Sequence, residues 1–287
     1  MNTRRILHEN LCATVDCTWP SMDVMELVIS AVVGIGIGVV VGMLGAGGGI
    51  LSVPALVYLL GQTPHDAAAG SLVIVLLSAF TSLLAHSRHN HVNWKGGMVF
   101  AAGAAVAAFG GARLAPLFSG TVLMILFSAL VLAVAILMLV RGVNGRSQEQ
   151  KHIDGEEPVV ATARVKNPRA WKIIVAGTTV GLMSGIFGVG GGFAVVPLLV
   201  MVFGFPMVEA AGTSVLIMMI SSVSGLLGRI GTPVEIDWPI VLVFAAGSAI
   251  GGLVGEPISR KARPSTLTIA FGVLLLVIAV LTALQNI

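Results

Sequence analysis

Two apolar segments, each interrupted by a cluster of glycines, constrain the fold of this chain more than any other feature. The first segment, 27–61, contains no charged residue and is interrupted at Gly45-Ala46-Gly47-Gly48-Gly49. As one straight helix it would be roughly 50 Å long, whereas the hydrocarbon core of a bilayer is about 30 Å thick. Glycine loses the most conformational entropy on folding, so helix is least stable at the cluster. The segment is therefore predicted to form two helical pieces that meet at membrane depth.

The same pattern recurs 143 positions later, which indicates an internal duplication of the whole chain. The second uncharged segment, 173–208, is interrupted at Gly188-Val189-Gly190-Gly191-Gly192. A proline follows each cluster at the equivalent position, Pro54 in the first half and Pro197 in the second. Each half of the chain is thus expected to open with a broken apolar helix.

The composition excludes a soluble globular protein. Hydrophobic residues make up 56% of the 287 positions and charged residues 10%, against about 25% charged residues in soluble domains. We therefore expect an all-α polytopic membrane protein of two homologous halves with five helical segments each, embedded in the lipid bilayer of a bacterial-type cytoplasmic (inner) membrane. The net charge of +3 does not indicate a nucleic-acid partner, because the basic residues fall in the loops between apolar segments.

Charge and hydropathy divide the chain into four parts. Residues 1–23 are a polar N-terminal tail, 24–141 the first transmembrane repeat, 142–170 a hydrophilic cytoplasmic linker and 171–287 the second transmembrane repeat. Within the repeats the apolar segments predict helices at 24–44, 50–60, 66–85, 96–112 and 120–140, and again at 173–187, 193–203, 210–228, 238–255 and 265–285.

Most of the Lys and Arg residues lie on the linker side of the predicted segments, which places the linker in the cytoplasm. If all ten segments cross, both termini lie outside. If the short pieces are re-entrant, the charge distribution is the same and both termini lie inside. Five crossings per half would give an inverted repeat whose broken helices meet near the midplane, and this arrangement is favoured.

The glycine clusters do not match nucleotide-binding motifs. No lysine in the chain follows a glycine, so neither cluster is a phosphate-binding loop. A dinucleotide fingerprint would need a glycine where Ile50 and Phe193 stand. We therefore expect no ATP site and no cofactor. Neither broken segment contains an acid, histidine or cysteine, which argues against an intramembrane enzyme.

Exposed backbone at the clusters predicts an anion-binding site. A short helix begins after each cluster, and its first N–H groups have no intrahelical partner. Helix N-termini carry partial positive charge and bind anions. The candidate residues are Gly47, Gly48, Gly49, Gly190, Gly191 and Gly192. The alternative is that these glycines only permit close packing of helices in lipid.

The tandem glycine motif resembles the sulfite exporter TauE/SafE family of membrane transporters. The resemblance rests on Gly42-x-x-Gly45-x-Gly47-Gly48-Gly49 with its twin in the second half, and on the pairs Asn93-Trp94 and Asp237-Trp238. It covers residues from about 25 to 285 and implies a secondary transporter or facilitator. The implied substrate is a small, sulfur-containing anion such as sulfite, sulfoacetate or another organosulfonate, bound between the two halves.

A membrane scaffold or assembly subunit without transport activity is the alternative function. A polar cavity between the halves, lined by both glycine clusters, would distinguish the transporter from the scaffold. The sequence does not indicate which anion is carried, the direction of transport, the coupling ion or the oligomeric state.

Polar side chains on the third segment of each half form a second candidate set. Hydroxyls that face the path would bind sulfonate oxygens, or they hydrogen-bond to neighbouring helices and to their own backbone. The aligned acids Asp66 and Glu209 are candidates for proton coupling, or first-turn acids favoured by the helix dipole. No metal site is expected. The candidate hydroxyl residues are Ser71, Ser78, Thr213, Ser214 and Ser221.

Overall fold

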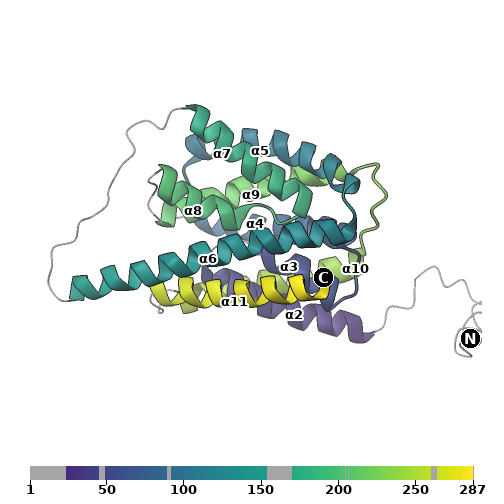
Figure 1. Cartoon of the computed structure of the whole chain (residues 1–287), viewed down its shortest axis with the longest axis horizontal. Coiled ribbons are helices and arrows are strands. Elements are labelled where there is room, and N and C mark those ends of the chain that lie inside the picture. Colours follow the sequence, from purple (N-terminus) through teal and green to yellow (C-terminus); the bar gives the residue numbers. More distant parts are fainter. Residues whose placement is uncertain are drawn as a thin grey trace, which may run out of the picture.

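The computed structural model describes residues 24–44, 49–88, 92–153, 170–203, 205, 207–259 and 264–286. Within these residues the chain forms ten α-helices and one short 3-10 helix, and no strand (Figure 1). The predicted all-α class and the five helical segments in each half are therefore confirmed. The tail 1–23, most of the predicted linker, and Gly47 and Gly48 of the first glycine cluster lie outside the described residues.

The helices occupy nearly the predicted positions. The first half consists of α2 (Val24–Leu44), α3 (Gly49–Tyr58), α4 (Pro64–Arg88), α5 (Trp94–Leu114), η1 (Ala115–Leu117) and α6 (Gly120–Ile153). The second half consists of α7 (Ala170–Phe187), α8 (Gly192–Phe203), α9 (Met207–Arg229), α10 (Trp238–Ser259) and α11 (Pro264–Asn286).

Helix α6 is longer than its apolar segment predicts. It continues past Val140 to Ile153, through the beginning of the predicted linker. The added residues include Gln148, Glu149 and Lys151, which are good helix formers without being apolar. The boundaries of the four parts of the chain otherwise stay predictions.

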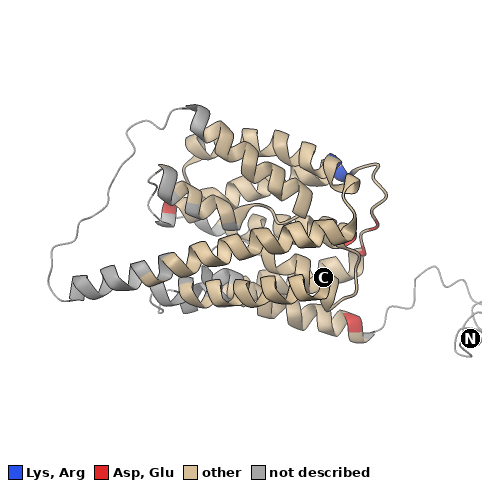
Figure 2. Ribbon diagram, viewed as in Figure 1, with Lys and Arg blue, Asp and Glu red and all other residues tan. Residues whose placement is uncertain are grey.

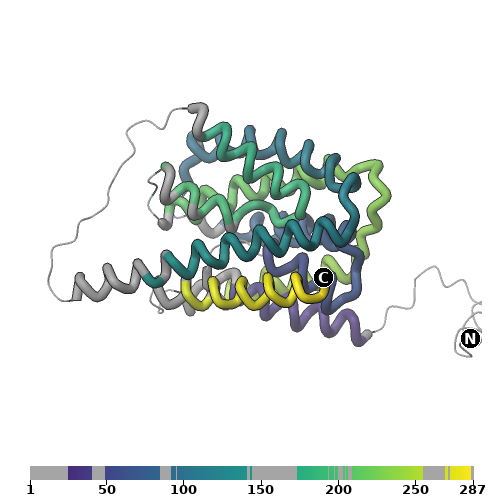
Figure 3. Tube along the Cα trace, in the orientation of Figure 1, coloured from purple at the N-terminus to yellow at the C-terminus, as the bar shows by residue number. Residues whose placement is uncertain are grey.

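The contacts between helices follow the duplication. Helix α2 packs along α10 and α7 packs along α5, so in both cases the first helix of one half meets the fourth helix of the other. The last helices of the two halves, α6 and α11, lie side by side and run in opposite directions (Figures 1 and 3). Equivalent helices are thus antiparallel, which is the arrangement of an inverted repeat.

The short helix α3 reverses the chain in the same way as a full crossing. In Figure 1 both α2 and α6 begin at the right-hand end of the molecule, and α11 finishes there. Two helices that begin at the same end must be separated by an even number of crossings. Between the starts of α2 and α6 that number is even only if α3 is counted with α2, α4 and α5. The arrangement agrees with five crossings per half.

Close contacts between glycine and backbone join the two halves. A Cβ atom at Gly38 of α2 would collide with the backbone of Ser248 in α10. In the equivalent pair, Cβ atoms on α7 would collide with the backbone of α5, at Gly181 with Ala104 and at Gly185 with Ala108. Small residues allow such close approach of helices in lipid. Gly36 has no heavy atom near its Cβ position, so it does not belong to this seam.

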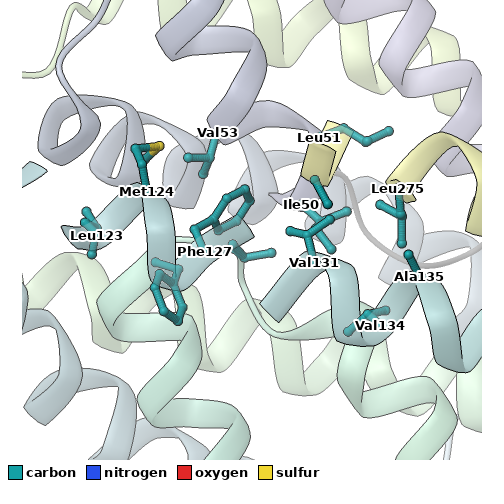
Figure 4. Close-up of a cluster of buried hydrophobic side chains, with 13 residues drawn as sticks. Ile50, Leu51, Val53, Leu123, Met124, Phe127, Val131, Val134, Ala135 and Leu275 are labelled. Carbon is teal, nitrogen blue, oxygen red and sulfur yellow. The ribbon is translucent and has the colours of Figure 1, made fainter. Parts of the chain in front are cut away.

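The largest core cluster surrounds the short helix α3. Every residue of α3 from Gly49 to Leu56 is buried, and Ile50, Leu51 and Val53 belong to the cluster shown in Figure 4. The cluster also includes Phe127 of α6 and residues of α11 and of the second glycine cluster. A helix too short to cross a bilayer is thus enclosed by longer helices.

The outside of the bundle suits a lipid environment. Four helical stretches among the described residues are long and apolar enough to cross a membrane: Pro64–Leu84, Gly96–Leu117, Gly120–Val140 and Glu209–Arg229. Large apolar side chains such as Phe80, Val106 and Leu281 are exposed. In Figure 2 the charged residues that can be seen in the described part of the chain lie at the two ends of the bundle.

A reporter protein fused after Ile287 should report an extracytoplasmic location. The reason is that α11 finishes at the end of the bundle where α2 begins (Figure 1), while the basic residues favour a cytoplasmic linker at the opposite end. A paired fusion within the linker, after Gly155, should give the opposite signal. Two cytoplasmic signals would contradict the five-crossing arrangement.

Candidate functional site

The second glycine cluster separates α7 from α8 with backbone that only glycine adopts readily. Gly188, Gly190 and Gly191 have φ angles of 74°, 69° and 74°, in the left-handed region that is unfavourable for residues with a Cβ atom. The predicted helix break is therefore confirmed in the second half. In the first half α2 ends at Leu44 and α3 begins at Gly49.

The two broken segments meet. Gly49, the first residue of α3, lies so close to Val189 of the second cluster that a Cβ atom would collide with the Val189 carbonyl group. On the neighbouring side, a Cβ atom at Gly188 would collide with the backbone of Ala68 in α4. Backbone of the first half thus packs directly on the backbone of the second break, and all these residues are buried.

Several N–H groups at the start of α8 have no acceptor among the residues that the structure describes. The first turn of α8 closes through Ala194 N and Val195 N, which donate to Gly191 O at 3.0 and 3.1 Å. The N–H groups of Gly190, Gly191 and Gly192 have no hydrogen-bond partner within the described part of the chain. Three buried donors at the start of α8 are therefore unpaired within the described residues, as expected for a helix N-terminus.

Two of the predicted serines hold the carbonyl groups of the break. Ser71 Oγ on α4 donates to Gly188 O at 2.6 Å and also lies 3.0 Å from Ala68 O. Ser221 Oγ on α9 lies 3.1 Å from Met218 O and 3.3 Å from Gly190 O. Both hydroxyls are fully buried. They fix the carbonyl side of the break, which leaves its N–H side available.

Two further buried serines have hydroxyls without partners beside the break. Ser222 of α9 and Ser184 of α7 are completely buried, and neither Oγ atom has a hydrogen-bond partner among the described residues. The Ser222 Oγ atom lies 3.3 Å from the Cβ position of Gly190, and the Ser184 Cβ atom lies 3.6 Å from that of Gly191. Hydroxyls and backbone N–H groups that lack partners among the described residues therefore belong to, or lie beside, the same glycines.

The remaining predicted hydroxyls are not brought to the second break. Ser78 Oγ donates to Val75 O at 3.1 Å and Ser214 Oγ to Ala211 O at 2.7 Å, each within its own helix. Thr213 Oγ1 accepts a hydrogen bond from Asn93 N at 3.0 Å, before the start of α5. In the duplication Ser78 corresponds to Ser221, and Ser214 corresponds to Ser71. The positions equivalent to Gly190 and Gly188, which Ser221 and Ser71 contact, belong to the first glycine cluster, outside the described residues.

The aligned acids form matching links between the halves. Glu209 Oε1 accepts from Asn93 Nδ2 at 2.8 Å, and Asp66 Oδ1 accepts from the backbone N–H of Glu235 at 2.9 Å. In each case the acid at the start of the third helix binds the chain just before the fourth helix of the other half. A role in proton coupling stays a prediction.

These observations define a polytopic membrane protein of two inverted halves with a donor-lined helix break between them. Residues 30–282 match the family model described as sulfite exporter TauE/SafE. The chain belongs to this family, as the tandem glycine motif predicts.

The curated relatives are transporters by name. A probable membrane transporter protein of Xylella fastidiosa (strain 9a5c) is 31% identical over 90% of this chain and 95% of its own length. The probable membrane transporter protein YunE of Bacillus subtilis is 29% identical over 88% and 96%, and a relative from Methanocaldococcus jannaschii is 25% identical over 83% and 88%. No solved structure matches the chain significantly.

Replacing Ser71 by alanine should destabilise the protein, because the buried Gly188 carbonyl group loses its hydrogen-bond donor. An unsatisfied buried polar group costs about 1–3 kcal/mol. The matched control is Ser78→Ala on the same helix. Among the described residues the Ser78 hydroxyl bonds within its own helix, so its loss should cost less than about 0.5 kcal/mol. Thermal unfolding of the purified proteins compares them, and equal stability of the two variants would contradict the assigned role of Ser71.

Proposed function

We propose that this protein is a secondary transporter or facilitator of a small, sulfur-containing oxyanion, such as sulfite or an organosulfonate. The observation that carries the proposal is the set of free donors at the second break. The N–H groups of Gly190, Gly191 and Gly192 and the hydroxyl groups of Ser184 and Ser222 are buried without acceptors among the described residues. The family description of sulfite export and the transporter names of the relatives support it.

Unsatisfied buried donors favour an anion at this position. Leaving such a group without a partner costs free energy, whereas a hydrogen bond to a charged acceptor contributes roughly 1.5–3 kcal/mol. The three oxygens of a sulfite or sulfonate group would accept from several of these donors at once. Gly49 packs against the same backbone, so it is the residue of the first cluster that we propose to border the site.

The proposed mechanism requires alternate exposure of the break to the two sides of the cytoplasmic membrane. The inverted halves supply two equivalent arrangements of the same helices, which is how inverted-repeat transporters change access. The protein would act without converting the anion chemically and without ATP. Ser71 and Ser221 would keep the carbonyl groups of the break turned away from the bound anion.

Flux through proteoliposomes that contain only this protein tests the proposal. Uptake of radiolabelled sulfite should be saturable, and unlabelled thiosulfate and methanesulfonate should compete with it more strongly than acetate. The control is Arg113→Gln, which changes an exposed arginine on α5 and should transport normally. Uptake equal to that of empty liposomes for every anion in the panel would favour the scaffold alternative.

A further inference from the structure

The second break contains no charged side chain, but a buried arginine lies near it. Arg229, the last residue of α9, is only 6% exposed. Its Nη2 atom donates to Gly185 O at 3.1 Å and Ile186 O at 3.3 Å, and its Nη1 atom to His65 O at 3.4 Å. Its Nε atom has no partner among the described residues. Within the described part of the chain, the acceptors of this guanidinium are therefore neutral carbonyl groups.

The nearest acid does not neutralise Arg229 directly. Asp66 attracts the guanidinium electrostatically, but its carboxylate is bonded to Glu235 N through Oδ1 and to the Thr63 hydroxyl through Oδ2, at 2.9 and 2.6 Å. No salt bridge joins Arg229 to an acidic side chain in the described residues. A buried charge without a paired counter-charge is costly. The carbonyl groups at the C-terminal end of α7 offset part of this cost, and a bound anion would offset it more fully.

The position of Arg229 connects this charge with the proposed anion site. Gly185 and Ile186 form the last turn of α7, immediately before the break at Gly188. Two of the three carbonyl contacts, at 3.3 and 3.4 Å, are at the long end of hydrogen bonding. An oxyanion offers shorter, charge-assisted bonds that a planar guanidinium makes through two donors at once, so it would replace these contacts favourably.

We propose that Arg229 supplies the positive charge that selects and holds the transported anion beside the second break. This inference rests on the proposed function, and it names the residue that recognises the charge of the substrate. The ligand class is a small oxyanion, such as sulfite or methanesulfonate, that reaches the free Nε–H group of Arg229 and the free donors of the break. His65, whose buried Nδ1 atom is also unpartnered within the described residues, lies next to this guanidinium.

Sulfite affinity measured by calorimetry on the purified full chain tests the role of Arg229. Arg229→Gln removes the charge and should weaken binding about tenfold or more, because one member of a buried charge pair is lost. Arg229→Lys keeps the charge without the planar fork and should fall between the wild type and Arg229→Gln. Arg113→Gln is the matched control, because Arg113 is exposed and stacks on Phe109 at 5.5 Å; its affinity should stay within about twofold of the wild type.

A folded Arg229→Gln protein with wild-type sulfite affinity would overturn the inference. If neither Arg229 variant folds, NMR spectra of wild-type protein labelled with ¹⁵N at arginine Nε test the inference instead. One Nε–H signal should shift saturably with sulfite, and a spectrum that does not change overturns the role of Arg229. Proteoliposome flux separates the two proposals. If the wild type transports sulfite and Arg229→Gln does so with an unchanged KM, only the role of Arg229 is refuted. If the wild type itself shows no flux, the proposed function is refuted as well.

Discussion

Replacing Gly49 by alanine should reduce sulfite flux to the level of empty liposomes. The added methyl group would collide with the Val189 carbonyl group and would lie 2.7 Å from the Val75 side chain. Because the first of these neighbours is backbone, it cannot rotate away. The two broken segments would have to separate, which displaces the free N–H groups of the second break from the position where they would bind an anion together with the first.

The control for this substitution is Gly36→Ala on α2. Gly36 has no heavy atom within 4 Å of its Cβ position, and alanine favours helix over glycine by about 1 kcal/mol. This variant should transport at the wild-type rate and be at least as stable. Flux and thermal stability should be measured on both proteins in the same lipid. Wild-type flux in Gly49→Ala would show that the contact between the breaks is not needed for transport.

Replacing Gly181 by leucine should prevent stable folding. Gly181 lies in the seam between α7 and α5, where even a Cβ atom would collide with the backbone of Ala104. Overpacking costs about 1–3 kcal/mol, and occasionally more. A leucine adds several atoms against backbone that cannot rotate away, in one of the two most extensive contacts between the halves. The matched control lies on the partner helix. Gly110 of α5 has no heavy atom within 4 Å of its Cβ position.

Gly110→Ala should therefore leave stability unchanged or raise it by up to about 1 kcal/mol. The yield of monodisperse protein and the unfolding temperature in detergent distinguish the two substitutions. A Gly181→Leu protein as stable as Gly110→Ala would mean that α5 and α7 separate without cost, and the inter-half seam would then not hold the fold together.

The helices were predictable because in this chain the boundaries coincide with changes in composition. Helix α2 spans the predicted residues 24–44, since charged residues precede it and glycines follow it. The last part of α6 was not predictable from hydropathy, because beyond Val140 the helix is polar and no apolar pattern marks it. The antiparallel packing of equivalent helices followed from the odd number of segments in each half.

The site was predictable only in part. Three nearly consecutive glycines indicated a break, and the positive φ angles confirm it. The partner of a hydroxyl depends on the tertiary fold, so the bond between Ser71 and Gly188 has no local signal. Ser184 and Ser222 were missed as site residues because the duplication places Val41 and Ala79 at the equivalent positions. The serines that recur in both halves, such as Ser71 and Ser221, therefore turned out to hold the backbone of the break. The serines whose hydroxyls lack partners among the described residues are not repeated.

Arg229 had only a weak signal in the sequence, as an arginine that could attract anions at a vestibule. It ends an apolar helix, and such residues usually mark the edge of a membrane. The duplication places His86 at its equivalent position in the first half, so no repeated pattern draws attention to it. Its burial follows from the approach of the end of α7 and the start of α4, which only the tertiary structure shows.

A structure of the full chain with selenite is the most direct test of the central claim, that an oxyanion binds at the second helix break. Selenite replaces the sulfur atom of sulfite by selenium, and anomalous scattering locates that atom in a crystal. We expect a selenium peak at the break, with the selenite oxygens about 3 Å from the N–H groups of Gly190, Gly191 or Gly192 and from the Ser184 or Ser222 hydroxyl. A transport-competent protein that binds selenite only away from these residues would contradict it.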